Sequence, residues 1–73
     1  MKTVEIKINL KPLMEKRGVN QEELSQAIEV PQGTISRWVN NRVDRYDRRI
    51  LEKLMVFFNC DLEDLFGIRV IEA

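Results

Sequence analysis

The stretch QEELSQAIEVPQGTISRW, residues 21–38, decides how this chain folds. Its first half consists of good helix formers. Asn20 before it and Glu23 three residues later can satisfy each other's backbone donors as a capping box. Pro31 ends this helix, because the residue before a proline is pushed away from the α region, and it suits the first position of a second helix. The pattern therefore predicts two helices joined by a tight turn over about residues 20–39.

The second of these helices has two unlike faces. Ile35, Trp38 and Val39 share one apolar stripe, which predicts that Trp38 belongs to the core. The other face carries side chains that hydrogen-bond or are very small: Gln32, Gly33, Ser36, Arg37 and Asn40. Such a face suits the major groove of DNA, because arginine can bind a guanine edge and glutamine an adenine edge, while glycine allows close approach. The alternative is an ordinary amphipathic surface helix, and the residues expected to contact bases are Gln32, Gly33, Ser36 and Arg37.

The segments QEELS (21–25) and VPQGTISRW (30–38) resemble the Cro-type (XRE-like) helix-turn-helix family of bacterial and phage repressors. The resemblance covers about residues 9–67 and implies an all-α, compact five-helix domain of the Cro/lambda-repressor-like type. Two positions depart from the family pattern. Glu29 stands where the family prefers glycine, and would need a left-handed or distorted backbone at a cost of ~1 kcal/mol. Ser25 replaces the usual alanine and is small enough to keep the two helices close.

The two ends of the chain have strand character. Residues 3–8 alternate apolar and polar side chains and are rich in β-branched residues, which predicts a strand. A lone strand cannot satisfy its own backbone, so it needs a partner. The β-branched tail 68–71 is the candidate, in the same chain or in a neighbouring one, and would add a small β-ribbon to the helices. The alternative is an unstructured tail at each end.

Three further helices are predicted from a polar capping residue at the start of each. Their ranges are 10–17, 48–58 and 62–66, with Asn9, Asp47 and Asp61 as caps. Gly18 and Gly67 are expected to end the first and the last of them, because glycine adopts the left-handed conformation of a helix C-terminus. Cys60, in the turn before the last helix, is predicted to be a small buried side chain and not a reactive thiol.

Composition narrows the class of protein. A chain of 73 residues has room for one domain, so residues 1–73 are expected to form a single helix-turn-helix unit. No apolar run reaches the ~20 residues that a membrane span needs, and the N-terminus lacks a signal-peptide core, so a cytoplasmic protein is expected. With no histidine and one cysteine, neither a zinc site nor a disulfide is expected. No nucleophile–base arrangement or phosphate-binding glycine loop is present, so we expect no enzyme, no cofactor and no small-molecule substrate.

The charge pattern is mixed. The formal net charge is zero, whereas nucleic-acid binders usually carry a positive excess. Residues 37–49, however, contain five arginines against Asp44 and Asp47, and phosphate contacts need only local positive charge. Two arginines directly after the Asp47 cap oppose the helix dipole, which indicates another use for their charge; the alternative is solvated arginines paired with the two aspartates. The residues expected to contact the DNA backbone are Gln21, Thr34, Asn40, Arg42, Arg45, Arg48 and Arg49.

Two functions follow from these patterns. The first is a sequence-specific regulator of transcription, a repressor, that binds double-stranded DNA as a homodimer with half-sites about one helical turn apart. The second is a protein-interaction module on the same scaffold, antitoxin-like or antirepressor-like, without DNA binding. The zero net charge and the acidic first helix of the motif favour this second hypothesis.

Overall fold

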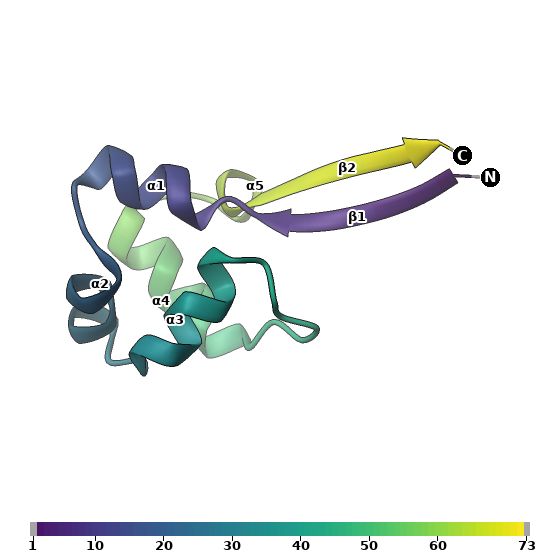
Figure 1. Ribbon diagram of the computed structural model, residues 1–73. Coiled ribbons are helices and arrows are strands. Elements are labelled where there is room, and N and C mark those ends of the chain that lie inside the picture. Colours follow the sequence, from purple (N-terminus) through teal and green to yellow (C-terminus); the bar gives the residue numbers. More distant parts are fainter. Residues whose placement is uncertain (1, 73) are drawn as a thin grey trace.

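Five helices and one two-stranded ribbon make up residues 2–72, the part of the chain that the computed structural model describes, with side chains described for residues 3–67 and 70 (Figure 1). In chain order the elements are β1 (Lys2–Ile8), α1 (Leu10–Arg17), α2 (Gln21–Ile28), α3 (Gln32–Val39), α4 (Arg48–Phe58), α5 (Leu62–Leu65) and β2 (Phe66–Glu72). The predicted five-helix architecture with a small ribbon is confirmed. No helix in residues 2–72 has the length and apolar character that crossing a membrane requires.

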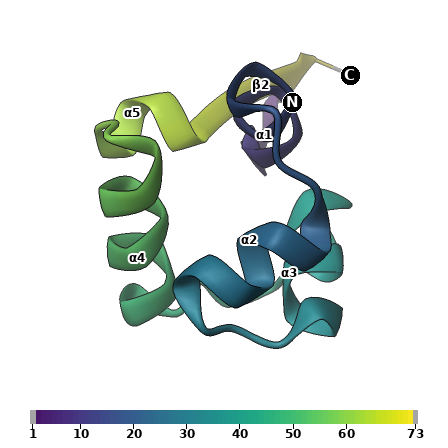
Figure 2. The same cartoon turned by 90° about the vertical axis from the view of Figure 1, so that its left-hand side faces the viewer.

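The core takes one large side chain from every helix. The fully buried residues of greatest volume are Leu10, Leu24, Ile35, Leu54 and Leu65, which come from α1 to α5 in turn. Burying one such side chain contributes about 1.5–3 kcal/mol, so each helix is held by its own anchor in a shared core. Viewed from the end opposite the ribbon, α2 and α3 lie side by side beneath α1, and α4 forms the adjacent wall (Figure 2).

The N-terminus of α2 is capped as its sequence predicts. The backbone N–H of Glu23 donates to Asn20 Oδ1 over 2.8 Å, and the N–H of Asn20 donates to Glu23 Oε1 over 3.0 Å. Both helix-end donors are therefore satisfied locally. At the other end, Glu29 adopts the left-handed conformation that its position demands, with φ 56° and ψ 48°. The Ser25 hydroxyl donates to the carbonyl oxygen of Val30, so it closes the turn in addition to keeping the helices close.

α3 begins one residue later than predicted, so Pro31 precedes the helix instead of occupying its first position. It occupies the capping position with φ −55° and an extended ψ of 140°, and the helix begins at Gln32. The carbonyl of Pro31 accepts hydrogen bonds from the backbone N–H groups of Thr34 (3.0 Å) and Ile35 (3.1 Å). The proline thus fixes the entry into α3 through its carbonyl, and its missing N–H costs nothing there.

One predicted side-chain cap and one predicted helix end are wrong, for one reason, although α1 spans Leu10–Arg17 as expected. Asn9 makes no capping hydrogen bond with its side chain, and Gly67 does not end α5 but lies inside β2. These two residues face each other: a Cβ on Gly67 would lie 3.2 Å from the Asn9 amide nitrogen. α5 stops at Leu65 because Phe66 is already extended and pairs with Ile8 in the ribbon. Strand pairing has overridden the local signals.

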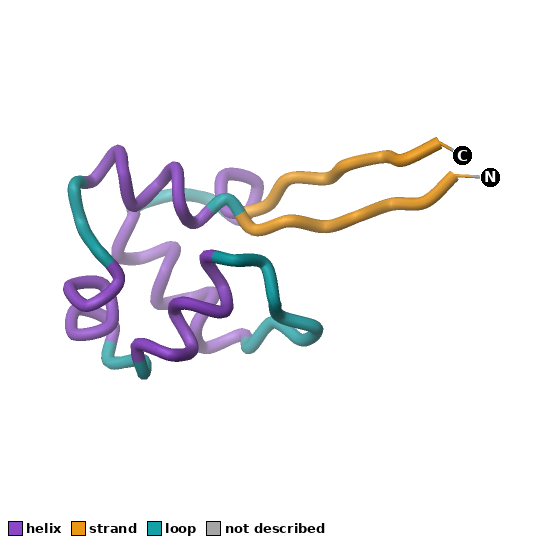
Figure 3. The backbone as a smooth tube through the Cα atoms, viewed as in Figure 1, coloured by secondary structure: helices purple, strands orange, loops and turns teal. Residues whose placement is uncertain are grey.

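β1 and β2 pair in antiparallel fashion within the same chain, as one of the two predicted arrangements requires. The register places Val4 opposite Val70, Ile6 opposite Ile68, and Ile8 opposite Phe66. The ribbon projects away from the helices, and the loop between α3 and α4 leaves the helical body on the same side (Figure 3). This projection makes the molecule elongated, with extents of 42 × 21 × 21 Å.

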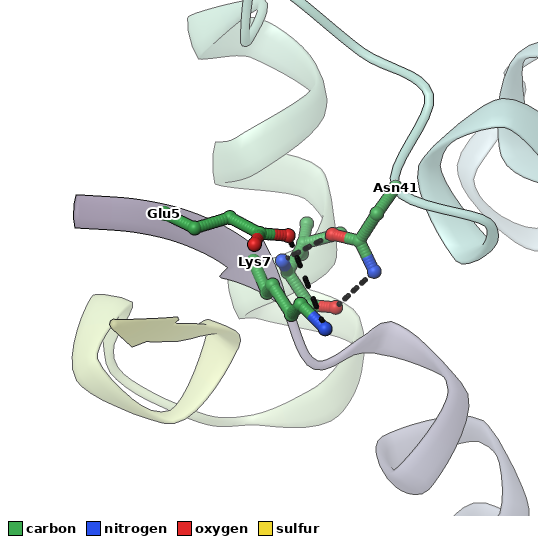
Figure 4. A network of polar contacts seen from close by, with 4 residues as sticks. Glu5, Lys7 and Asn41 are labelled. Carbon is green, nitrogen blue, oxygen red and sulfur yellow. Dashed lines mark hydrogen bonds and ion pairs between the residues drawn. The ribbon is translucent and has the colours of Figure 1, made fainter. Parts of the chain in front are cut away.

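Asn41 fastens the end of α3 to the base of the ribbon. Its side-chain oxygen accepts from the backbone N–H of Ile8 over 2.7 Å, and its amide nitrogen donates to the carbonyl of Ile8 over 3.4 Å (Figure 4). The residue adopts a left-handed φ of 57°, which asparagine tolerates better than most residues. The amide thus pairs with β1 as a strand neighbour would, and ties together two segments 33 residues apart.

This link can be tested with Asn41→Gly. Glycine keeps the left-handed backbone without strain but removes both hydrogen bonds to Ile8, so we expect a loss of about 1–2 kcal/mol in the free energy of unfolding. Asn59→Gly is the matched control, because Asn59 is also left-handed (φ 49°) at a helix end. Urea denaturation measures both. Equal stabilities for the two variants would show that the Asn41 amide contributes nothing.

Glu29→Gly should stabilise the fold. Removing the Cβ relieves the left-handed strain, so we expect a gain of about 1 kcal/mol, or roughly 4–8 °C in Tm for a domain of this size. Glu22→Gly is the control: Glu22 lies in the first turn of α2, where glycine is expected to lower the Tm. Thermal unfolding followed by circular dichroism gives both values. A lower Tm for Glu29→Gly would mean that its carboxylate makes a compensating interaction.

Candidate nucleic-acid interface

The back of α3 is held firmly in the core. Ile35 is 1% exposed and Trp38 is 3% exposed, as the apolar stripe predicts. The Trp38 ring meets Tyr46 edge-on with centroids 5.4 Å apart, and Tyr46 meets Phe66 in the same way at 5.0 Å. This aromatic chain joins α3 to the loop after it and to the start of β2. The rotation of α3 about its own axis is therefore set by the core.

The outward face of α3 carries the residues predicted to contact bases. Gln32, Gly33 and Arg37 are exposed, whereas Ser36 is half-buried. The Arg37 guanidinium is held only loosely, with Nη2 3.5 Å from Thr34 Oγ1. Asn40 is more constrained, because its amide nitrogen donates back to the carbonyl of Ser36 over 2.9 Å. Three of the four residues predicted to contact bases are thus exposed at the surface.

Beside this face, α3 and the following loop enclose a hollow of about 340 Å³. Its charged lining consists of three arginines and two aspartates: Arg37, Arg42, Arg45, Asp44 and Asp47. Thr34 lines it as well, so the structure brings four of the predicted DNA-contacting residues around one concavity. The arginines outnumber the aspartates by one, so the lining of the hollow is net positive in a chain of zero net charge.

Comparison with known proteins identifies the family and the fold. The profile of the Cro/C1-type HTH DNA-binding domain matches residues 9–69. The chain belongs to this family. It is a family of DNA-binding regulators and not of enzymes, so the predicted resemblance is confirmed. The crystal structure of the transcriptional regulator VanUg (form II) is similar with a TM-score of 0.72 and 21% identity, over 90% of this chain and 87% of that one, which shows a shared fold. No curated protein sequence matches the chain.

The remaining predicted backbone contacts of this Cro/C1-type domain lie elsewhere. Gln21 is half-buried in the first turn of α2. Arg48 is paired with Glu52, one turn further along α4, at 3.3 Å between Nε and Oε1. Arg49 lines a separate groove of about 520 Å³ between α2 and α4, which also contains Lys53 and Glu29. Neither Arg48 nor Arg49 lines the hollow beside α3, so the predicted arginine cluster is divided between two surfaces.

Asp47 caps α4 as predicted and does not pair with the arginine side chains that follow it. Its Oδ1 accepts from the backbone N–H groups of Arg49 (2.8 Å) and Ile50 (3.4 Å). The carboxylate therefore balances the helix N-terminus that the two arginines would otherwise oppose. The alternative prediction, in which Arg48 and Arg49 pair with Asp44 and Asp47, is not what the structure shows. Arg48 forms its ion pair with Glu52.

Asn41 is the positioning residue that the sequence did not single out. A left-handed asparagine after a helix is a recognisable local signal, and the Asn40–Asn41 pair supplies it. The partner, Ile8, is 33 residues away, and no periodicity or capping rule identifies such a pairing. The orientation of α3 relative to β1 therefore depends on a contact that only the folded chain reveals.

The surroundings of Cys60, which is half-buried and not fully buried as predicted, disfavour its thiolate. Burial raises the pKa of its thiol, with the nearby carboxylates of Asp64 and Asp61 adding to the shift. A raised pKa disfavours the thiolate that reactions and metal ligation require. Within the part of the chain that the structure describes, no group of three or more histidine, cysteine, aspartate or glutamate side chains is placed to hold a metal ion.

Proposed function

We propose that the protein is a cytoplasmic, sequence-specific repressor of transcription that binds double-stranded DNA as a homodimer, with α3 in the major groove. One observation carries the proposal: α3 is anchored by Ile35 and Trp38 and presents Gln32 and Arg37 outward, next to an arginine-lined hollow. Membership of the Cro/C1-type family supports DNA as the ligand.

Base reading is assigned to the exposed face of α3. Arg37 has the length and freedom to reach a guanine edge, and Gln32 can pair with an adenine edge. Ser36 is half-buried and serves as a short contact between them. Gly33 has open space around a hypothetical Cβ, so the protein itself does not require glycine there. Close approach of the DNA accounts for a residue that a helix otherwise disfavours.

Phosphate contacts are assigned to the rim of the hollow, where Thr34, Arg42 and Arg45 gather beside Arg37. A phosphate there would be met by positive charge directly after the end of the recognition helix. Gln21 supplies a further contact from the N-terminus of α2, where backbone N–H groups favour an anion. Asn40, Arg48 and Arg49, which do not line this hollow, complete the predicted set.

The short length of α3 favours a homodimer. α3 has eight residues and is therefore about 12 Å long, which covers only a few base pairs. A two-fold pair of such helices would read two half-sites about 34–36 Å apart, and the target would be a palindrome. Selection of random duplexes on the purified protein tests this: we expect a palindromic motif, and a non-repeating motif would contradict the dimer.

The alternative is a protein-interaction module that has lost DNA binding. The zero net charge, the exposed Glu22 and Glu23 on α2, and Asp44 and Asp47 in the hollow favour it. Fluorescence anisotropy with the selected duplex over a range of salt concentrations separates the two. Affinity that falls with salt supports DNA binding, because phosphate contacts release counterions. No binding even at low salt would support a protein partner.

Arg37→Ala and Arg45→Ala should have different effects on DNA binding. Loss of Arg37 should relax base preference at one position of each half-site, at about 1–3 kcal/mol, whereas loss of Arg45 should weaken binding to all sequences alike. Anisotropy with the selected duplex and with single-base variants measures both effects. The two variants remove the same charge, so identical profiles would refute the separate roles assigned to them.

Gly33→Ala should lower the affinity for the duplex without lowering the stability of the fold. Alanine has no neighbour to clash with in the protein and is the better helix former, so the free energy of unfolding should stay equal or rise by up to about 1 kcal/mol. Duplex affinity should fall nonetheless, because the methyl group occupies space that the DNA needs. Denaturation and anisotropy on the same sample test this. Unchanged affinity would place Gly33 outside the interface.

A further inference from the structure

The groove of about 520 Å³ between α2 and α4 is separate from the proposed base-reading surface. It lies where the end of α2 meets one side of α4 (Figure 2) and shares no lining residue with the hollow beside α3. Its floor is apolar, with Ala27 and Ile28 from α2 and Val56 and Phe57 from α4. Its volume falls within the ~300–1,000 Å³ that is usual for binding sites.

Val56 extends this apolar floor into solvent. It is 82% exposed, the highest value of any large apolar side chain that the structure describes, whereas the adjacent Phe57 is half-buried. Valine is a weaker helix former than alanine or lysine, so the stability of α4 does not call for it at an exposed position. Val56 follows Lys53 by three residues and Arg49 by seven, so the three side chains lie on one side of the helix.

The charges of the groove are unevenly satisfied. Arg49 and Lys53 are one turn apart on α4, a spacing at which like charges weaken a helix. Among the described side chains neither of them forms an ion pair, and the neighbouring Glu52 is already paired with Arg48 at 3.3 Å. The groove therefore presents two cations against the single free carboxylate of Glu29.

We propose that this groove binds an acidic amphipathic helix of a second protein. Carboxylates of that helix would meet Arg49 and Lys53, and its apolar side chains would cover Val56 and Phe57. A helix laid into an apolar groove is a recurrent mode of peptide recognition, and here the pattern of charge selects an acidic partner. The inference goes beyond the proposed function and does not depend on DNA binding.

Other occupants fit the groove less well. Small ligands are usually buried over 70–90% of their surface, and a wall as exposed as Val56 cannot enclose one. The apolar floor does not suit a phosphate. The chain's own α5 has an exposed leucine between acidic residues, but with four residues it is roughly 6 Å long, against roughly 12 Å along α4 from residue 49 to residue 57.

The location of the groove has a consequence for regulation. The partner helix would contact the end of α2 and one side of α4, whereas the side chains assigned to base reading belong to α3. A duplex and the partner can therefore occupy the same molecule at once. The groove would serve to bring a second protein to the site where this one is bound.

Fluorescence anisotropy with a labelled helical peptide of about 14 residues tests the groove. The peptide carries glutamates at positions i and i+4 and leucines at i+7 and i+8, and a control peptide has lysines in place of the glutamates. The acidic peptide should bind the full chain, and the lysine peptide should bind at least about tenfold more weakly. Equal affinities for the two peptides, or no binding of the acidic one at millimolar concentration, would overturn the proposal.

A matched pair of variants locates the contact. Lys53→Glu should weaken binding of the acidic peptide at least about tenfold and strengthen binding of the lysine peptide, whereas Lys11→Glu, the same change on the exposed face of α1, should alter neither. Val56→Ser removes an exposed side chain without disturbing the core and should weaken the acidic peptide roughly fivefold. Identical behaviour of the Lys53 and Lys11 variants would place the peptide elsewhere. Self-association of the chain that Lys53→Glu abolishes would assign the groove to a second copy and also overturn the proposal.

Adding the acidic peptide to the complex with the selected duplex separates this inference from the proposed function. Both ligands should stay bound, and Lys53→Glu should bind the duplex as Lys11→Glu does. Displacement of the duplex, or a weaker duplex affinity for Lys53→Glu than for Lys11→Glu, would make the groove part of the DNA site and refute the inference. If the acidic peptide binds and no duplex does, the groove assignment stands and the DNA-binding proposal fails.

Discussion

Trp38 packs beneath α3 against Tyr46, which packs in turn against Phe66, so that one chain of aromatic rings runs from the recognition helix to β2. With Ile35 buried one turn earlier, only one rotation of α3 about its axis satisfies the core. That rotation places Gln32 and Arg37 at the surface together. The polar face of α3 is therefore a consequence of packing on its other side, and a change in the core would redirect the side chains proposed to contact DNA.

A second constraint links the end of α3 to the ribbon. Asn41 pairs with both backbone groups of Ile8, which is itself buried at the point where β1 enters the core. The base of the ribbon is therefore tied directly to the residues that follow α3.

Zero net charge is compatible with DNA binding when the charge is arranged as it is here. The hollow beside α3 gathers Arg37, Arg42 and Arg45, and its aspartates reduce the local excess without cancelling it. Long-range attraction to the duplex should be small as a result. Discrimination among sequences would then depend more on base contacts from α3 than on general attraction to phosphate, which suits a regulator that must not occupy DNA at random.

Local rules predicted the parts of the fold that depend on neighbours in sequence. The Asn20 capping box, the Asp47 cap and the buried stripe of α3 all involve residues within one or two turns of a helix. The two errors, the missing side-chain cap at Asn9 and the helix end at Gly67, arose where β1 and β2 pair across almost the whole chain. The exposure of Arg37 depends on the periodicity of its own helix and could be predicted. The hollow depends on how the following loop folds against α3 and could not be predicted.

The path of the loop after α3 decides which arginines meet, and that path depends on long-range contacts of Tyr46 and Asn41. Arg48 and Arg49, adjacent to the loop in sequence, consequently point to other surfaces.

The most direct test of the central claim, that α3 and the following loop contact DNA, is a titration of ¹⁵N-labelled protein with the selected duplex, followed by amide chemical shifts. The account predicts that the largest changes cluster on Gln32 to Arg37 and on residues 42–45. Changes concentrated on α1 or α4, with α3 unaffected, would contradict it.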